Sequence, residues 1–213
     1  MLTVDYLLNV YKPSDDLERT DLELFRKFVA EYGGRIYDRV PNQPVITTSA
    51  FVVNPDFSKA LLIHHKLHGQ TKQFGGHADG NPDLAGNAAN ELLEESGAKG
   101  KLLSPYPIDF IRWNFPYREK EGIIYPAHDC FDILFLFTIP ESAEIKPNKN
   151  ESWGAKWEDL KIWRDTFDRT NSTNAANPQN WDYQQRVYKK VKLFNEKFLE
   201  KRANHWHDIN FPG

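Results

Sequence analysis

Residues 129–139 constrain the fold most, because this segment is apolar on both of its alternating faces. The apolar side chains on one face are Phe131, Ile133 and Phe135, and those on the other are Leu134 and Leu136. A strand without a polar face needs cover on both sides of its sheet, which is typical of a central strand. The segment therefore predicts a layered α/β (or α+β) domain with helices packed against a sheet.

The composition excludes several classes of protein. The 213 residues include 27 Lys and Arg against 30 Asp and Glu, a net charge of −3. This balance argues against non-specific nucleic-acid binding, which needs an excess of basic residues on one face. No run reaches the roughly 18 apolar residues of a membrane span, and the N-terminus lacks a secretory signal pattern. One cysteine, Cys130, fits a reducing compartment. We expect a cytoplasmic globular protein that does not bind membranes.

The chain divides into an extension and a domain. Residues 1–44 are predicted to form a helical extension that packs on the core, with a capping box at Asp15 and Glu18. The domain is expected to span 45–213, with its core at 45–165. The core begins with a hairpin, because residues 45–53 and 59–65 are rich in strand-forming side chains on either side of a turn.

The C-terminal part is expected to be a loop at 171–180 followed by a long helix at 181–202. Five basic residues lie outside the apolar stripe of this helix: Arg186, Lys189, Lys190, Lys192 and Lys197. We interpret them as a solvated face, because acidic residues are mixed among them, with nucleic-acid binding as the alternative. The terminal helices either pack on the core or form a homodimer contact.

Residues 75–97 carry the chemistry. Two glycines, Gly75 and Gly76, precede a predicted helix in which Asn81 is the N-cap and Pro82 occupies the first turn. Gly97 ends this helix. At about 100° per residue, the apolar side chains fill one half of the helix. Three carboxylates, those of Glu91, Glu94 and Glu95, fall within a neighbouring arc.

Three crowded carboxylates repel one another, and burial adds to the cost of their charge. A hard divalent cation relieves both penalties, because Mg²⁺ takes oxygen ligands and keeps waters and substrate phosphates in its shell. The glycine pair can bring a backbone carbonyl to the same ion, since glycine leaves no side chain in the way. The alternative interpretation is an ordinary solvated acidic face at a helix end.

These residues resemble the Nudix hydrolase family. Its signature is a glycine, five residues, a glutamate, seven residues, and then Arg-Glu, an apolar residue, any residue, Glu-Glu, any residue, glycine and an apolar residue. From Gly76 onward the chain matches it at these positions: Glu91, Leu92, Glu94, Glu95, Gly97 and Ala98. Two positions depart from it, with Pro82 in place of the first glutamate and Asn90 in place of the arginine. In the family, that arginine holds a catalytic glutamate by a salt bridge.

The resemblance covers roughly residues 45–160 and extends to the hairpin, to residues 128–137 and to residues 151–157. It implies a Nudix-like α/β/α sandwich with a mixed sheet. The implied activity is hydrolysis of a nucleoside diphosphate linked to another moiety, by attack of water on phosphorus with Mg²⁺ as cofactor or Mn²⁺ as a substitute. The implied partner is a small-molecule nucleotide substrate.

The resemblance also implies roles for individual residues. Glu91, Glu95 and the Gly75 carbonyl are expected to bind the metal, and Glu94 a further, substrate-bound metal. The base is either a glutamate of the helix or an acid on a late loop, where Glu151 is the candidate and a plain turn residue is the alternative. His77, Lys66 and Arg112 are candidate substrate contacts.

Further side chains have two readings each. Asp132 lies in an apolar strand and needs a partner, which is either structural or part of the site's surroundings. Aromatic residues near the site either stack a nucleobase or belong to the core: Trp113, Phe115, Tyr117 and Trp153. Cys130 is interpreted as a small buried apolar residue. Because Asn90 replaces the arginine, a nucleotide-binding module that does not hydrolyse its ligand is the main competing function.

Overall fold

The computed structural model describes residues 2–40, 43–66, 70–115, 117–120, 123–165 and 179–201. Eight strands form one sheet in the order β10 (Ser152–Asp159), β2 (Lys59–His65), β1 (Val45–Val53), β9 (His128–Thr138) and β5 (Lys101–Leu102), with three further strands at its margins. β3 (Gln70–Lys72) pairs with β2, β4 (Phe74–His77) with β1, and β6 (Asp109–Phe115) with β9. β7 (Arg118–Lys120) and β8 (Ile123–Tyr125) form a separate ribbon.

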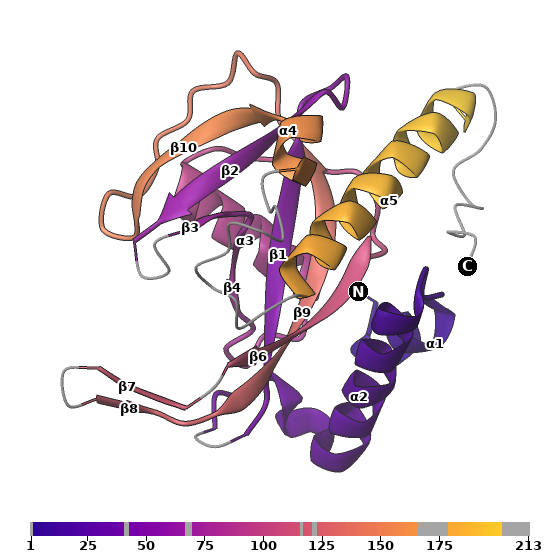
Figure 1. The fold of residues 1–213 in the computed structure, drawn as a ribbon, viewed down its shortest axis with the longest axis vertical. Helices are drawn as coiled ribbons and strands as arrows, with labels where there is room; N and C mark the ends of the chain where they lie inside the picture. Colours follow the sequence, from indigo (N-terminus) through magenta and orange to yellow (C-terminus); the bar gives the residue numbers. More distant parts are fainter. Residues whose placement is uncertain are drawn as a thin grey trace.

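The sheet is mixed. β1 and β9 run parallel from Val45 opposite Cys130 to Val53 opposite Thr138, whereas the other pairs are antiparallel. β1 is bordered on its other edge first by β4 and then by β2. The predicted hairpin and the predicted central strand are confirmed, and the expected layered α/β architecture is present (Figure 1).

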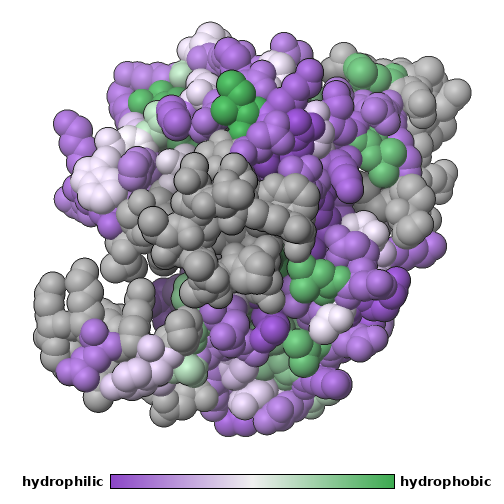
Figure 2. Space-filling model, in the orientation of Figure 1, coloured by the Kyte–Doolittle hydropathy of each residue, from purple (hydrophilic) through white to green (hydrophobic). Residues whose placement is uncertain are grey.

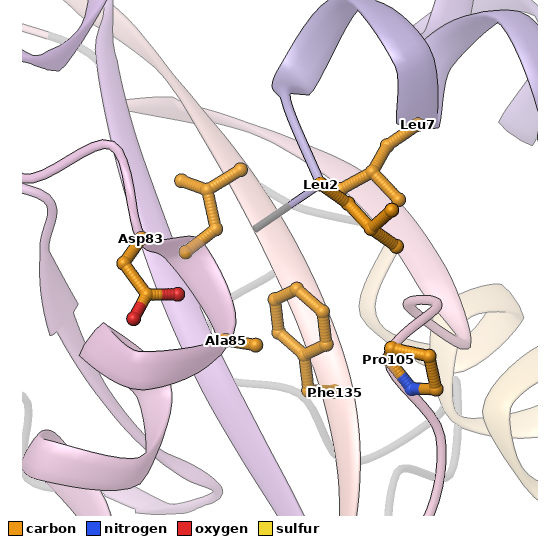
Figure 3. Close-up of a pocket in the computed structure, with 7 residues that line it drawn as sticks. Leu2, Leu7, Asp83, Ala85, Pro105 and Phe135 are labelled. Carbon is orange, nitrogen blue, oxygen red and sulfur yellow. The ribbon is translucent and has the colours of Figure 1, made fainter.

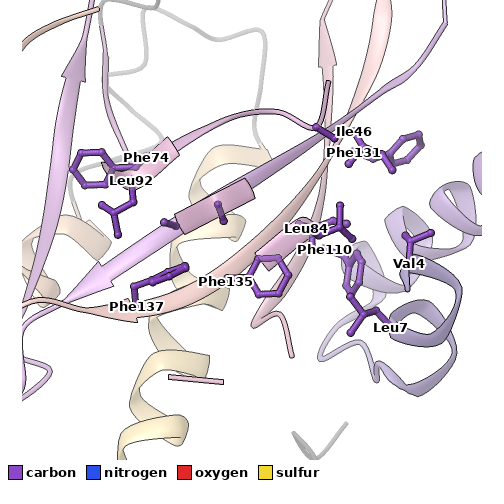
Figure 4. Packing of buried hydrophobic residues seen from close by; sticks show 14 of the residues in the cluster. Val4, Leu7, Ile46, Phe74, Leu84, Leu92, Phe110, Phe131, Phe135 and Phe137 are labelled. Atoms are coloured by element: carbon purple, nitrogen blue, oxygen red, sulfur yellow. The ribbon is translucent and has the colours of Figure 1, made fainter. Parts of the chain in front are cut away.

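Helices cover both faces of the sheet. One hydrophobic cluster joins the sheet to α1 (Val4–Val10), α2 (Asp16–Tyr32) and α3 (Leu84–Ser96), and Figure 4 shows its packing. A second cluster joins the other face to α4 (Leu160–Asp165) and α5 (Gln179–Lys201). β9 sends Phe131, Ile133 and Phe135 to the first cluster and Leu134 and Leu136 to the second, as its alternation predicts.

The N-terminal extension consists of more than the single predicted helix. α1 precedes α2, and α2 continues into a 3₁₀ turn, η1 (Gly33–Tyr37). The predicted start of α2 is confirmed, because the Asp15 side chain accepts a hydrogen bond of 2.8 Å from the Glu18 N–H. The helix ends at Gly33, which is the C-cap with φ of 55°.

The interpretation of the C-terminal helix as having a fully solvated basic face is wrong for Arg186 and Lys190, which are both buried. Arg186 donates two hydrogen bonds, of 2.9 and 3.1 Å, to Asp109 of β6. Lys190 donates to Glu18 of α2 and, at 2.6 Å, to the Tyr11 hydroxyl. The terminal helices are therefore joined to the sheet and to each other by buried ion pairs. The predicted loop at 171–180 lies almost entirely outside the described residues.

The coloured part of the surface in Figure 2 is mostly hydrophilic, with hydrophobic residues in small separate groups. Within the described residues, no helix combines the length and the apolar character that crossing a membrane requires.

Candidate active site

The glycine pair lies in β4, with Gly75 opposite Ser49 and Gly76 opposite Thr48 of β1. Backbone and side chains crowd both positions. A Cβ on Gly75 would stand 2.4 Å from Ser49 Oγ, and one on Gly76 would stand 2.2 Å from Glu91 Oε1. Gly75 also has φ of 157°, within the range that favours glycine. Gly75 thus lets β4 lie close to Ser49 of β1, and Gly76 leaves the space that the Glu91 carboxylate of α3 occupies.

The helix that carries the glutamates begins two residues later than predicted. Asp83 is the N-cap, and its side chain accepts a hydrogen bond from the Gly86 N–H. Asn81 instead accepts a hydrogen bond of 2.9 Å from the Asp83 N–H, a turn that precedes the helix. Pro82 therefore lies before the cap and not in the first turn. Gly97 ends the helix in a left-handed conformation, as expected.

Glu95 is the most enclosed of the three glutamates, with 2% of its surface exposed. Its Oε2 accepts a hydrogen bond of 2.9 Å from the Gly75 N–H, and its Oε1 lies 3.9 Å from His65 Nε2. Burial raises the pKa of Glu95 to about 7, although the Gly75 N–H and the Lys72 charge oppose the increase. The hydrogen bond from Gly75 thus holds the Glu95 carboxylate against the glycine pair, where a bound cation would stabilise its charged form.

Glu91 is half-buried beside Gly76. Burial, together with the negative charges of Glu94, Glu151 and Asp79, raises the pKa of Glu91 to about 7. Glu94 lies on the exposed side of the helix. The repulsion that the sequence predicts among these carboxylates is therefore present in the folded chain.

Glu151 comes from a distant loop to this cluster. Its carbonyl accepts a hydrogen bond of 2.8 Å from the Lys66 N–H, and its own N–H donates to Asn148, at 3.1 Å. Its side chain is exposed, and its charge raises the pKa of both Glu91 and Glu95. The fold thus brings the Glu151 side chain within electrostatic range of Glu91 and Glu95 on α3. The backbone of Glu151 also forms hydrogen bonds that hold its own turn.

The three predicted substrate contacts have different surroundings. His77 is half-buried in β4, where burial and the nearby Arg39 charge lower its pKa. The Lys66 ammonium group donates to the Lys149 carbonyl and so braces the Glu151 loop.

Arg112, the third predicted substrate contact, is paired with two carboxylates. Its Nη1 donates a hydrogen bond of 2.9 Å to Asp129, and its Nε lies 3.5 Å from Asp21 of α2. These two carboxylates compensate much of the guanidinium charge, and the role of Arg112 as a substrate contact stays a prediction.

Sequence reasoning missed Lys72, the last residue of β3. Its side chain is half-buried, and its charge lowers the pKa of Glu91, Glu95, Asp132 and Cys130. Lys72 therefore lies within electrostatic range of all four groups. The signal available in the sequence was its position three residues before Gly75, on the strand segment that leads into the glycine pair.

The two departures from the family signature lie away from the glutamate–glycine contact. Asn90 and Pro82 are both exposed. A different amide, that of Asn87, joins the elements by donating to Thr48 Oγ1 and to the His77 carbonyl, each at 3.0 Å. The side chains of the site are therefore held in place by β4, β1 and the buried side of α3.

The expected partners of Asp132 are present. Its Oδ1 accepts hydrogen bonds of 2.8 Å from Thr47 Oγ1 and 2.9 Å from Ser49 Oγ. Cys130 is buried, as interpreted, and burial raises the pKa of its thiol to about 12. Among the aromatic candidates, Trp153 is 63% exposed and lies edge-on to His64, so it is not a core residue.

The donor set fits a hard divalent cation in type. The candidate ligands are carboxylate and carbonyl oxygens, and the missing Cβ atoms of the glycines leave the backbone open beside them. Among the described residues, no three His, Cys, Asp or Glu side chains form a cluster able to hold a metal.

A cavity of about 180 Å³ lies elsewhere, between α1, the start of α3 and β9 (Figure 3). Its lining is apolar apart from Asp83, whose carboxylate caps α3: Leu2, Leu7, Asp83, Leu84, Ala85, Pro105 and Phe135. It does not include the glutamates of the site.

The fold and the site define an α/β protein in which a glutamate-bearing helix is packed against a glycine pair. No protein-family model matches the chain, and no curated protein does. Among solved structures, the chain is similar to a NUDIX-family hydrolase from Clostridium perfringens, with 20% identity over 70% of this chain and 97% of that one and a TM-score of 0.48. It is similar to the MutT protein from Methanosarcina mazei Go1 (17% identity, 74% and 99% coverage, TM-score 0.48). It is also similar to a C. elegans Ap4A hydrolase in a binary complex (14% identity, 72% and 98% coverage, TM-score 0.45).

Proposed function

We propose that this protein is a Nudix-type, Mg²⁺-dependent hydrolase that cleaves the pyrophosphate bond of a nucleoside diphosphate linked to another moiety. The observation that carries the proposal is the packing of Glu91 and Glu95 against Gly75 and Gly76, with both carboxyl pKa values raised to about 7. A fold that places two costly carboxylates on a backbone free of side chains gains stability when a cation binds there.

In this proposal Glu91, Glu95 and the Gly75 carbonyl hold Mg²⁺, for which Mn²⁺ can substitute, and Glu94 binds a further ion that arrives with the substrate. Bound metal neutralises phosphate charge and acidifies water. Lys72 adds a positive charge on the side of β3, and His77 is a candidate phosphate contact from β4.

Glu151 is the proposed general base. Its loop is held by the hydrogen bond between the Lys66 N–H and the Glu151 carbonyl, while its carboxylate stays exposed and free to accept a proton from water. Phosphoryl transfer requires positioning and charge neutralisation more than covalent chemistry, so these groups suffice for the reaction.

A second candidate function is a nucleotide-binding module without turnover. Asn90 favours it, because an exposed short amide cannot replace the salt bridge that the arginine makes in the family. The two candidates differ in turnover and agree in binding.

The test incubates the pure protein with Mg²⁺ or Mn²⁺ and a panel of nucleoside diphosphate-linked compounds, with products identified by mass. We expect a nucleoside monophosphate among the products, and we expect Glu95→Gln to abolish its release. Glu144→Gln is the matched control, because Glu144 is an exposed glutamate that forms an ion pair with the equally exposed Lys146. Tight binding of a panel member without any product would favour the module.

A further inference from the structure

Several buried polar atoms without a hydrogen-bond partner lie where α5 begins to cross the sheet (Figure 1). Among the described residues, five buried side-chain polar atoms have no hydrogen-bond partner: Asp132 Oδ2, Thr138 Oγ1, Tyr183 Oη, Gln184 Oε1 and Arg186 Nη1. Three of them lie within four consecutive residues near the start of α5, and Asp132 lies on the strand face that α5 covers, whereas Thr138 lies at the far end of β9. Buried polar groups in native proteins are nearly always paired, so this group needs a ligand or another explanation.

Asp132 offers one free acceptor. The side chain is 2% exposed, and the Thr47 and Ser49 hydroxyls occupy Oδ1, which leaves Oδ2 without a hydrogen bond. The nearby Gln73 side chain lowers the pKa of this carboxyl but does not form a hydrogen bond with Oδ2. A buried carboxylate oxygen in this state is matched by an N–H or O–H donor.

Tyr183 lies on the other side of the same region. It is 5% exposed, and its ring contacts the Trp113 ring edge-on at 5.3 Å. Burial and the Asp132 charge raise the pKa of its hydroxyl, so the two side chains are within electrostatic range of each other. An acceptor, a hydroxyl and an indole ring therefore share one region between β9, β6 and α5.

This region adjoins the candidate active site through Gly75. Ser49, which donates to Asp132, lies so close to Gly75 that a Cβ there would stand 2.4 Å from its hydroxyl oxygen. Gly75 in turn donates its N–H to Glu95. A substrate whose phosphates lie at the glutamates, on the α3 face of the sheet, would reach Asp132, on the α5 face, by passing the edge of β4 at Gly75.

We propose that Asp132 and Tyr183 bind the amino-bearing edge of a nucleobase, which makes Asp132 a specificity-determining residue. An exocyclic amino group supplies the donor that Oδ2 lacks, and Trp113 offers an aromatic surface to a flat heterocycle. The inference rests on the proposed function for its substrate class. It adds that bases with an amino group are preferred over the same bases without it.

The test measures binding by calorimetry in Mg²⁺ with α,β-methylene diphosphates, whose bridging bond cannot be hydrolysed. Two ligand pairs differ only in one amino group, namely guanosine against inosine and adenosine against purine riboside. We expect the amino-bearing member of at least one pair to bind about tenfold tighter or more, the typical value of a charge-assisted hydrogen bond.

Asp132→Asn should bring this ratio close to one, because the amide can turn a donor toward the ligand. Tyr183→Phe, which leaves the strand intact, should lower the same ratio if Asp132→Asn does not fold. Thr138→Val is the matched control, because it removes another unpartnered buried oxygen at the far end of β9 and should keep the ratio.

Equal binding within both pairs would overturn the inference, and so would equal weakening of both members in Asp132→Asn, which indicates a structural role only. Because binding is measured without turnover, the two proposals can fail separately. Selective binding by a protein that hydrolyses nothing would refute the hydrolase alone, whereas hydrolysis without selectivity would refute the role of Asp132 alone.

Discussion

Arg186 of α5 and Asp109 of β6 form a pair of hydrogen bonds of 2.9 and 3.1 Å in the interior, where both side chains are buried. Removing the guanidinium leaves the Asp109 carboxylate enclosed, and its remaining ion pair within the described part of the chain is with Lys190, at 3.5 Å, which also pairs with Glu18. We expect Arg186→Met to lower the free energy of unfolding by about 3–5 kcal/mol, as loss of one partner of a buried pair does.

The measurement is urea unfolding at equilibrium, with Lys189→Met as the control. Lys189 neighbours Lys190 on α5 but is exposed, so its replacement should change stability by less than about 0.5 kcal/mol. Similar losses in both variants would show that α5 does not depend on the buried pair.

Gly76→Ala tests the close approach of strand and helix. The new methyl group would overlap the Glu91 carboxylate, so the carboxylate must move away from the glycine pair. We expect the Mg²⁺ affinity to fall by about tenfold or more, comparable to disturbing the residues that orient a metal ligand. Gly34→Ala is the matched control, because nothing lies within 4 Å of a Cβ there and its φ is not positive. Calorimetric titration with Mg²⁺ distinguishes the two.

The stability of the metal-free protein should fall as the pH rises. Glu91 and Glu95 have pKa values of about 7 in the folded chain against 4.5 in the unfolded chain, so folding retains their protons between these values. Their contribution is fully present below pH 4.5 and is lost as the pH passes 7. Because Mg²⁺ binds the deprotonated carboxylates, it should raise the melting temperature more at pH 8 than at pH 5.5.

Thermal unfolding in EDTA and in MgCl₂ at both pH values measures this difference. Glu95→Gln should reduce it, and an equal Mg²⁺ effect at both pH values would contradict the assignment of these carboxylates as ligands.

Glu95→Gln should lower kcat by at least about a hundredfold, since loss of a metal ligand costs no less than loss of the groups that orient it. The same change removes a charge whose burial is unfavourable, so the folded state should be as stable as the original at pH 8. Steady-state kinetics and urea unfolding of one preparation report both effects. Loss of activity together with loss of folding would not support a catalytic role.

Asn90→Arg restores the arginine of the family signature. Asn90 is exposed, and the glycine pair already positions Glu91 and Glu95, so we expect kcat to change by less than about threefold, the range of surface substitutions. An increase of about a hundredfold would mean that the original chain lacks an essential contact and would favour the binding module.

The sequence predicted what depends on local patterns. The alternation of residues 129–139 gave the correct faces of β9, and the spacing from Gly76 to Ala98 placed Glu91 and Glu95 on the side of α3 that meets β4. The helix starts later than the sequence predicted. The Asn81 side chain accepts a hydrogen bond from the Asp83 N–H in a turn before the helix, which leaves Asp83 as the N-cap.

Contacts between distant residues were beyond the sequence. The charges of Arg186 and Lys190 looked solvated because their partners lie 77 and 172 residues away, at Asp109 and Glu18. Arg112 resembled a free cation for the same reason, since Asp21 is 91 residues away. Lys72 was missed because only the turn from β3 into β4 brings it within range of the glutamates.

The buried link between Lys190 and Glu18 also bears on synthesis. During translation, Glu18 and Asp109 emerge from the ribosome well before α5, the helix that carries their cationic partners. Until α5 emerges, a nascent chain that closed around these acids would enclose uncompensated charge, so we expect stable tertiary structure to form only after α5 has left the ribosome.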